Sequence, residues 1–358
     1  MALKDIVAKL PFKKQESFLT RMLIMRFSAM GDVAMTIPVI HSLAEQHRDL
    51  RITVLTRSRF TPMFQWLPAN VEVRGIDLDA YEGITGLTKL YNELSKQKFD
   101  IVADLHDVIR TKYIRTCFLM GGTKVAVVDK GRKEKHSLIG NGQTAQPLRP
   151  MVERYADVFR KLGYPVTLEY TKAFNPLTEN FKDVRAVVGR KEEGEKWIGI
   201  APFAAHEQKV YPLEKMHDAA NLLLERGYKV FLFGAGKEES EELSTWECSG
   251  MKSVCGKLGG LHNEMLLISQ LDAMVSMDSA NMHLASLVGT KVVSIWGATH
   301  PKAGFVGYGQ TDDGIVQVDL PCRPCSVYGN TACKLGDFRC MNNILPEDIV
   351  NTVVKQIR

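Results

Sequence analysis

The residues best placed to do chemistry lie where an apolar strand meets a helix, late in the chain. Asp278 and Ser279 directly follow the apolar run 273–277, and a helical pattern begins at Ala280. The free N–H groups of a helix's first turn form an anion site, which the helix dipole strengthens. His283 lies in that turn and can face the same point. A diphosphate and its attached sugar would fit there.

The same residues also have a purely structural interpretation. Asp278 or Ser279 can cap the helix, and His283 can be an ordinary histidine on a helix surface. Under either interpretation, a helix that ends at Gly289 and an apolar strand at 292–296 complete a strand–helix–strand unit. A second chemical group elsewhere in the chain is needed to decide between them.

Such a group is Asp32, which follows Gly31 at another strand-to-helix turn. Glycine lets the backbone approach a ligand closely, and a carboxylate there could accept a proton from a hydroxyl or simply cap the next helix. Lys209 lies on a loop after a strand, where it can neutralise a phosphate or remain solvated. Glu238 in the turn GAGKEE could accept hydrogen bonds from a ribose, although this turn is neither a full dinucleotide fingerprint nor a P-loop.

Size and charge limit the class of protein. The chain has 358 residues, enough for two domains, and it shows neither a long apolar run nor a secretory signal, so we expect a cytoplasmic protein. Residues 1–172 hold 27 Lys and Arg against 18 Asp and Glu, although the whole chain carries only +5. A basic half indicates an anionic partner: nucleic acid, a membrane surface or a phosphorylated substrate. No nucleic-acid-binding motif supports the first.

Apolar strands alternate with helices in both halves of the chain, which predicts two doubly wound α/β sheets. The expected strands are 22–27, 51–56, 71–76, 100–105, 124–128, 197–201, 229–233, 273–277 and 292–296. The expected helices are 33–46, 87–97, 111–120, 151–162, 213–226, 241–248, 263–270, 280–288 and 344–357. Because ligands bind at the carboxyl edges of such sheets, the two domains should face each other across a cleft.

The domain boundaries follow from this pattern. We expect an N-terminal extension at 1–20, Rossmann-like domains at 21–172 and 178–345, and a last helix at 346–358 that could cross back to the N-terminal domain. The extension has helical spacing and four lysines, so it could lie on a membrane surface or pack on the body of the protein.

Three further groups of residues have open interpretations. Asp77 and Asp79 resemble a metal-binding D-x-D, but an acidic solvated turn is the simpler interpretation. A basic segment could meet the phosphates of an anionic acceptor or be solvated; it holds Lys130, Arg132, Lys133, Lys135 and His136, with Arg110 and Lys112 nearby. Four cysteines have a spacing that a structural Zn²⁺ or a set of free thiols would fit; they are Cys322, Cys325, Cys333 and Cys340.

Three stretches, taken together and in order, resemble a known family. They are FSAMGDVAMTIPVIHSL, the K-x-Tyr-Pro loop at Lys209, and DSANMHLASLVGTKVVSIWGATHP. The combination is similar to that of the ADP-heptose:lipopolysaccharide heptosyltransferases, glycosyltransferase family 9, which have the GT-B fold of two facing Rossmann-like domains. The resemblance covers residues 21–358 and includes the CMNNILPEDIV run near the end. It departs from the family at Ala204, Ala205, Ala280 and Asn281, which leaves the sugar open.

The resemblance implies roles for the residues above. Asp32 matches the family's general base, and Lys209 matches the lysine that neutralises the donor diphosphate. Asp278, Ser279 and His283 match the segment that holds phosphate and sugar, with the helix N-terminus at Ala280 stabilising the leaving group. Glu238 falls near the nucleotide. Gly31, Arg110, Lys112, Lys130, Arg132 and Lys133 are the residues expected to meet the acceptor.

The implied reaction is an inverting transfer of heptose from ADP-heptose to the inner core of lipopolysaccharide, at the inner membrane. Positive groups can replace Mg²⁺ at the diphosphate, so the reaction is expected to require neither a metal nor a cofactor. Two alternatives remain: the same fold with another nucleotide-sugar donor, or a non-catalytic protein that binds a nucleotide sugar. Loss of turnover in Asp32→Asn would separate an enzyme from a binding protein.

Overall fold

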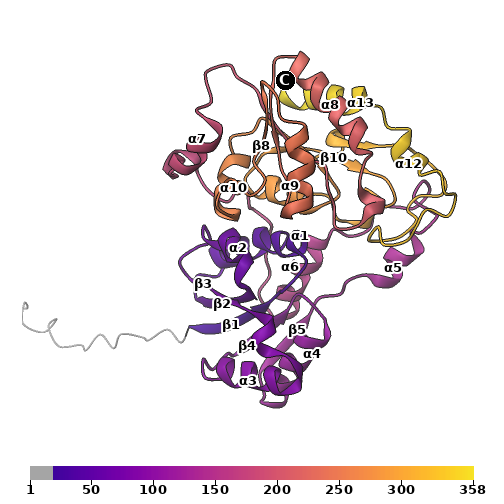
Figure 1. Ribbon diagram of the computed structural model, residues 1–358. Helices are drawn as coiled ribbons and strands as arrows, with labels where there is room; N and C mark the ends of the chain where they lie inside the picture. Colours follow the sequence, from indigo (N-terminus) through magenta and orange to yellow (C-terminus); the bar gives the residue numbers. More distant parts are fainter. Residues whose placement is uncertain (1–18) are drawn as a thin grey trace, which may run out of the picture.

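The structure is a computed structural model that describes residues 19–358. The amphipathic helix expected at 1–20 lies almost entirely outside the described residues, and Thr20 begins the first strand. Two α/β domains are stacked, with the N-terminal domain below and the C-terminal domain above in Figure 1. The expected architecture of two doubly wound sheets is confirmed.

The N-terminal sheet has five parallel strands in the order β3-β2-β1-β4-β5. Its strands are β1 (Thr20–Met25), β2 (Leu50–Arg57), β3 (Val71–Ile76), β4 (Ile101–Asp104) and β5 (Lys124–Val127). Its helices are α1 (Met30–Ala34), α2 (Ile37–Gln46), α3 (Gly83–Ser95), α4 (Ile109–Met120), α5 (Arg132–Ser137) and α6 (Met151–Lys161). The central strand β1 is buried on both faces, because Met22 and Ile24 enter one apolar cluster and Leu23 and Met25 another.

The C-terminal sheet has six parallel strands in the order β11-β10-β9-β6-β7-β8. Its strands are β6 (Trp197–Ala201), β7 (Lys229–Leu232), β8 (Met251–Ser253), β9 (Ala273–Met277), β10 (Lys291–Trp296) and β11 (Ile315–Gln317). Its helices are α7 (Lys182–Val188), α8 (Leu213–Glu225), α9 (Gly236–Thr245), α10 (Leu261–Ile268), α11 (Ala280–Leu287), α12 (Arg339–Asn342) and α13 (Pro346–Ile357). Within residues 19–358, every helix is too short or too polar to cross a bilayer.

Several element boundaries differ from the predicted ones. The helix expected at 33–46 is broken into α1 and α2, with Pro38 in the first turn of α2, where its missing N–H is tolerated. The basic loop expected at 129–136 contains the short helix α5. The turn expected at GAGKEE already belongs to α9, which starts at Gly236, five residues before the predicted start. Instead of crossing back to the N-terminal domain, α13 packs against α8, β9 and β10.

The domains also share apolar contacts. One buried cluster runs without a break from Met22 of β1 to Trp296 of β10. On one side of the interface, Trp66 of the N-terminal domain stacks on His262 at a centroid distance of 5.4 Å. On the other side, the backbone N–H groups of Gly140 and Gly142 donate to carbonyl oxygens of residues 323 and 324. These contacts fix how the two carboxyl edges face each other.

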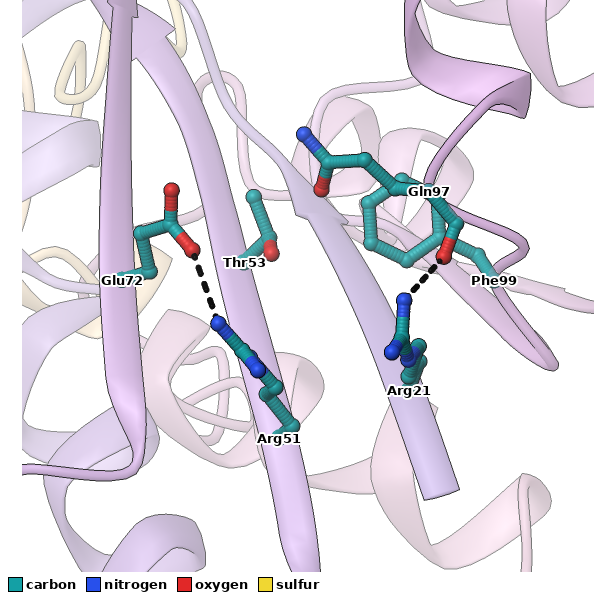
Figure 2. A pocket seen from close by; sticks show the side chains of 6 residues that line it. All are labelled: Arg21, Arg51, Thr53, Glu72, Gln97 and Phe99. Carbon is teal, nitrogen blue, oxygen red and sulfur yellow. Dashed lines mark hydrogen bonds and ion pairs between the residues drawn. The ribbon is translucent and has the colours of Figure 1, made fainter. Parts of the chain in front are cut away.

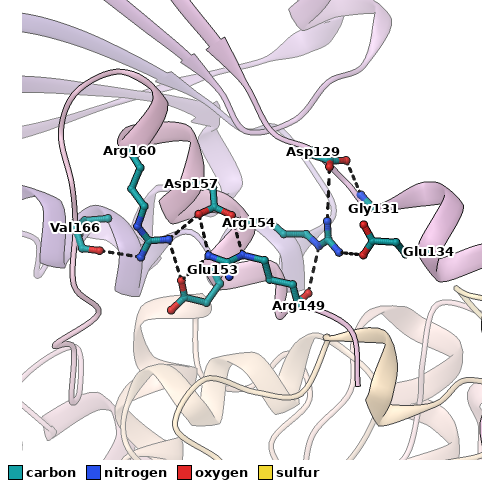
Figure 3. A network of polar contacts seen from close by, with 9 residues as sticks. All are labelled: Asp129, Gly131, Glu134, Arg149, Glu153, Arg154, Asp157, Arg160 and Val166. Carbon is teal, nitrogen blue, oxygen red and sulfur yellow. Dashed lines mark hydrogen bonds and ion pairs between the residues drawn. The ribbon is translucent and has the colours of Figure 1, made fainter. Parts of the chain in front are cut away.

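A network of charges around α6 holds the segment that carries α5 (Figure 3). Arg154 is buried, donates to the Glu134 carboxylate and lies 3.8 Å from that of Asp129. Gly131 packs directly on this guanidinium, because an added Cβ would lie 2.5 Å from it, and its φ of +59° suits glycine. The basic segment is therefore anchored to the domain.

A hollow of about 380 Å³ lies at the amino edge of the N-terminal sheet, where the strands begin (Figure 2). Its residues stand at or just before the starts of the strands; they are Arg21, Arg51, Thr53, Glu72, Gln97 and Phe99. Ligands of parallel α/β sheets bind at the other edge, where the strands end. The amino-edge hollow is therefore not part of the cleft between the domains.

Candidate active site

The turn after β1 presents Asp32 to the cleft between the domains. Its carboxylate Oδ2 pairs with the Arg26 guanidinium at 2.8 Å and accepts from the Ala29 backbone N–H at 3.3 Å. The Tyr155 hydroxyl donates to the other oxygen, Oδ1, at 3.5 Å. Burial raises the pKa of Tyr155 well above its ordinary value, so the phenol remains a donor. The carboxylate is oriented from behind, with 29% of its side chain exposed.

His106, two residues after the end of β4, supports this turn. Its Nδ1 accepts from the Phe27 backbone N–H at 3.4 Å, and its Nε2 lies 3.3 Å from the Ser28 hydroxyl. Burial, aided by the Arg26 charge, lowers the pKa of His106 to about 3, so the ring is neutral. A neutral ring that accepts at Nδ1 carries its proton at Nε2, which makes it the donor to Ser28.

The opposite side of the cleft is built on α11. Lys209, on the loop after β6, pairs with the Asp278 carboxylate at 2.8 Å and donates to the Asp278 carbonyl at 3.1 Å. The Ser279 hydroxyl bonds to the Ser276 hydroxyl at 3.1 Å instead of capping the helix. The alternative interpretation, in which Asp278 or Ser279 caps α11 with its side chain, is therefore not what the structure has. The backbone N–H groups that begin at Ala280 remain available to a ligand.

His283 marks the point where the two sides meet. A Cβ added to Gly31 would lie 2.6 Å from the His283 ring and 3.7 Å from the Ala280 Cα, so a side chain at Gly31 would push the domains apart. Burial lowers the pKa of His283 to about 4, against the opposing charges of Asp278 and Asp32. The turn that carries Asp32 therefore packs against the first turn of α11, and the Asp32 charge acts on the His283 ring.

The segment between β11 and α12 closes over Lys209. A Cβ at Gly329 would lie 2.6 Å from the Lys209 Cγ, and Gly329 has a φ of +76°. Arg323 holds the segment in place, because its buried guanidinium donates to the carbonyls of Trp296, Gly297 and Thr299. Lys209 is therefore enclosed, with only 15% of its side chain exposed.

Comparison of the chain with known proteins identifies its family. The model of glycosyltransferase family 9 (heptosyltransferase) matches residues 87–335. The chain belongs to glycosyltransferase family 9. Lipooligosaccharide heptosyltransferase 2 of Campylobacter jejuni is 23% identical over 90% of this chain and 93% of the relative. Lipopolysaccharide heptosyltransferase 3 of Escherichia coli is 26% identical over 77% of this chain and 82% of the relative.

Solved structures of the family share the fold. A family 9 glycosyltransferase from Veillonella parvula superposes with a TM-score of 0.72 over 95% of this chain and 97% of its own, at 17% identity. The E. coli ADP-heptose lps heptosyltransferase II gives a TM-score of 0.69 over 94% and 98%, at 19% identity. The predicted GT-B architecture of this family 9 chain is thereby confirmed.

The structure brings most of the predicted site residues of this family 9 chain together. Gly31 and Asp32 meet the group that comprises Lys209, Asp278, Ser279, Ala280 and His283. Glu238 instead has an exposed side chain in the first turn of α9. Its neighbour Glu239 accepts from the Ala235 backbone N–H at 2.7 Å and shapes the turn.

The predicted acceptor-binding cations gather around one carboxylate that sequence reasoning missed. Asp107 lies 3.8 Å from Lys112 and 3.2 Å from Arg132, and its carbonyl accepts from Lys130. Asp107 holds an uncommon φ of +48° for a residue other than glycine. Arg110 and Lys133 are exposed.

Lys135 fits neither interpretation of the basic segment, because it is neither solvated nor turned toward an acceptor. It is buried, and its ammonium lies 4.1 Å from the Phe305 ring centroid and 2.8 Å from the Met151 sulfur. Burial and the Arg154 charge lower the pKa of Lys135 to about 8. The lysine therefore packs at the contact between the domains and does not face an acceptor.

Neither of the two candidate metal-binding groups is assembled as a metal site in the described residues. The Asp77 carboxylate accepts from the Asp79 backbone N–H at 3.2 Å, as in a solvated acidic turn. All seven cysteines are free thiols. Across residues 19–358, no three His, Cys, Asp or Glu side chains stand together at metal-binding spacing.

Sequence reasoning also missed the residues that orient Asp32. Arg26 ends an apolar strand, so a cation there is a signal, because a buried charge requires a partner. Tyr155 and His106 gave no such signal, since they come from elements 123 and 74 residues farther along the chain than Asp32. Only the fold brings them to this turn.

Proposed function

We propose that the protein is an inverting glycosyltransferase that moves heptose from ADP-heptose to the inner core of lipopolysaccharide. Its family membership supports glycosyl transfer, and the names of the curated relatives support heptose as the sugar. The observation that supports the proposal is the packing of Gly31 on His283 and Ala280, because it brings the turn that carries Asp32 against the first turn of α11.

In the proposed reaction, Asp32 is the general base. Its Oδ2 is occupied by Arg26 and the Ala29 N–H, whereas Oδ1 has, among the partners in residues 19–358, only the longer bond from Tyr155. We infer that Oδ1 accepts the proton of the acceptor hydroxyl as that oxygen attacks the anomeric carbon. Direct displacement from the face opposite the diphosphate inverts the anomeric centre, and base catalysis of this kind contributes about 10²–10⁴-fold.

The departing diphosphate would be stabilised from the other side of the cleft. Lys209 supplies a full positive charge, and the N–H groups that begin at Ala280 supply the positive end of α11. Asp278 keeps the lysine in place until the donor arrives, and Ser279 and His283 would contact phosphate and sugar. These groups already provide the charge that the leaving group needs, so we propose a reaction that does not depend on a metal.

The acceptor would approach from the N-terminal domain. The cations around Asp107, together with Arg110 and Lys133, give this side an excess of positive charge that suits phosphates of an inner core. Such an acceptor is carried by a lipid, so we propose that the protein works in the cytoplasm at the surface of the inner membrane.

Asp32→Asn is the decisive test of this function. The variant should lose about 10³-fold in turnover of ADP-heptose with an inner-core acceptor, while ADP binding measured by calorimetry stays unchanged. Asp312→Asn, at an exposed carboxylate far along the C-terminal domain, is the matched control and should retain activity. Full turnover in Asp32→Asn would rule out the proposed base.

A thermal-shift panel of ADP-, GDP-, UDP- and CMP-sugars tests the donor separately. A ligand that binds only the folded state raises the melting temperature by mass action. ADP-heptose should give the largest shift. Selective stabilisation by a UDP-sugar would replace the proposed donor while leaving the fold and the base unaffected.

A further inference from the structure

Two isoleucines at the edge of the N-terminal domain are left uncovered by the part of the chain that the structure describes. Ile84, in the first turn of α3, is 71% exposed, and Ile109, the first residue of α4, is 84% exposed. A single exposed aliphatic residue is ordinary on a protein surface. Two that adjoin form a small apolar patch, and their relative position therefore matters.

Contacts between α3 and α4 place the two isoleucines at the same end of this helix pair. The Thr88 and Tyr113 hydroxyls are 2.6 Å apart, and the Tyr91 and Phe118 rings pack at 5.0 Å. The two helices therefore run side by side in the same direction. Ile84 and Ile109 each lie four residues, about one turn, before the Thr88–Tyr113 contact, on the same face of their helices. Both side chains therefore lie where the two packed helices begin.

This end of the seam lies at the edge of the sheet that holds the candidate active site. Both α3 and α4 begin after strands whose carboxyl ends lie at the same edge as Asp32, because the strands are parallel. Leu119 and Met120, at the far end of α4, are also exposed but lie at the opposite edge. The N-terminal domain therefore has one exposed apolar pair at the edge that faces the C-terminal domain, Ile84 and Ile109, and another at the opposite edge, Leu119 and Met120.

The charges beside the two isoleucines indicate what covers them. Arg110 and Lys112 are exposed in the first turn of α4, and the positive ends of both helices point the same way. Asp79 and Glu82 lie on the α3 side, so the cationic part of the surface is the α4 side, where Arg132 and Lys133 follow. Apolar tips flanked by cations match a bilayer with anionic headgroups.

We propose that Ile84 and Ile109 insert into an anionic lipid bilayer and dock the N-terminal domain there, with its cleft beside the membrane surface. The inference rests on the proposed function, because a lipid-borne acceptor must be reached at the headgroup level. Arg110 and Lys112 would lie at the headgroup level, where they meet phosphates of the lipid-borne acceptor and of the surrounding lipids alike, while the isoleucine side chains enter the acyl boundary. Docking through Ile84 and Ile109 would thus determine where the reaction takes place without altering its chemistry.

Vesicle binding by the full-length chain tests the proposal. The double variant I84Q/I109Q changes no charge, so it isolates the apolar contribution. It should bind phosphatidylglycerol–phosphatidylethanolamine vesicles about tenfold or more weakly than the wild type in co-sedimentation. The matched control L119Q/M120Q removes another exposed apolar pair, from the other end of α4, and should bind like the wild type. Pure phosphatidylcholine vesicles should bind all three chains weakly.

Each other outcome overturns the proposal. Equal loss of vesicle binding in both double variants would show that Ile84 and Ile109 have no specific role in docking. Unchanged binding in I84Q/I109Q would show that another surface of the protein binds the membrane. If light scattering finds that I84Q/I109Q changes only the oligomeric state, a second copy of the chain covers the pair. Transfer to a water-soluble acceptor fragment should be equal in all three chains, so failure of docking remains distinct from failure of the proposed function.

Discussion

The two sides of the cleft present charged groups in opposite arrangements. On the N-terminal side, the carboxylate Asp32 faces the cleft and a buried arginine, Arg26, stands behind it at 2.8 Å. On the C-terminal side, the lysine Lys209 faces the cleft and a buried carboxylate, Asp278, stands behind it, also at 2.8 Å. In each pair the group proposed to act is more exposed than its partner. Each domain thus orients its reactive group with a counter-charge of its own.

The difference between the pairs lies in how far each reactive group is enclosed. Asp32 is 29% exposed and keeps one carboxylate oxygen nearly free, whereas Lys209 is 15% exposed and is covered by Gly329. A base must remain open to an incoming hydroxyl. A lysine that meets a diphosphate gains from low dielectric, because enclosure strengthens its charge interactions. The comparison predicts that perturbing each pair has a distinct consequence.

Lys209→Met should produce the largest effect among changes on the C-terminal side. Removal of an electrostatic stabiliser of a leaving group typically costs about 10²–10³-fold in turnover. ADP affinity should fall as well, whereas Asp32→Asn should leave it unchanged. Steady-state kinetics and calorimetry with ADP measure the two quantities. Unchanged turnover in Lys209→Met would mean that the two sides of the cleft do not share one reaction.

Arg26→Met tests whether the buried arginine positions the base. We expect turnover to fall by up to about 10²-fold, because a small misplacement of a reacting group can cost that much. Arg26→Lys should restore part of the loss, since it keeps the charge but not the two-headed geometry that reaches both Asp32 and the Leu105 carbonyl.

The readout that separates positioning from general damage is the pattern of kinetic constants. Arg26→Met should lower kcat while leaving ADP affinity and the KM for the donor unchanged, because Arg26 lies on the N-terminal side. A parallel loss of ADP affinity would show that the variant disturbs the whole cleft instead.

Asp278→Asn should mainly reduce stability. Removing one partner of a buried ion pair leaves the other charge uncompensated, which costs about 3–5 kcal/mol when both partners are fully buried and less here because Lys209 is partly exposed. A bound diphosphate can replace the lost carboxylate. The rise in melting temperature on adding saturating ADP should therefore be larger in Asp278→Asn than in the wild type; an equal rise would contradict the proposed contact between Lys209 and the diphosphate.

The sequence predicted the parts of this arrangement that repeat a local pattern. The strands that end at Met25 and Met277 are apolar and are followed by polar turns, so their carboxyl edges and the residues on them could be placed correctly. The short edge strands β8 and β11 have three residues each and offer no period to detect. The early start of α9 was missed because its first residue is a glycine, which disfavours a helix on propensity alone.

The partners of the reactive groups could not be predicted in the same way. Tyr155 reaches Asp32 across 123 positions of sequence, and Lys209 reaches Asp278 across 69. Such contacts depend on the order of strands in each sheet, which no local pattern encodes. The order of the motifs in the sequence indicated that Asp32 and His283 belong to one site. Only the structure shows that Gly31 packs on the His283 ring, which explains why residue 31 has no room for a side chain.

The pH dependence of stability extends the comparison to a histidine on each side of the cleft. Burial lowers the pKa of His283 to about 4 and that of His106 to about 3, from an ordinary value of 6.5. Above pH 6.5 the rings are neutral in both folded and unfolded chains. As the pH falls below 6.5 the unfolded chain binds protons that the folded chain refuses, so stability is lost progressively toward pH 4.

Melting temperature measured from pH 7 to pH 5 tests this, because carboxylates are still largely ionised in that range. The wild type should lose several degrees, and His283→Asn should lose less, because the buried ring that rejects a proton is gone; Asp278, Asp32 and Lys209 face this ring. His136→Asn, at an exposed position, should follow the wild type.

His106 has hydrogen bonds at both ring nitrogens, whereas within residues 19–358 the His283 Nδ1 is buried without a partner. Replacing His283 should therefore cost less intrinsic stability than replacing His106, and the reverse order would show that the contact between the domains depends on the His283 ring more than on the turn beneath Asp32.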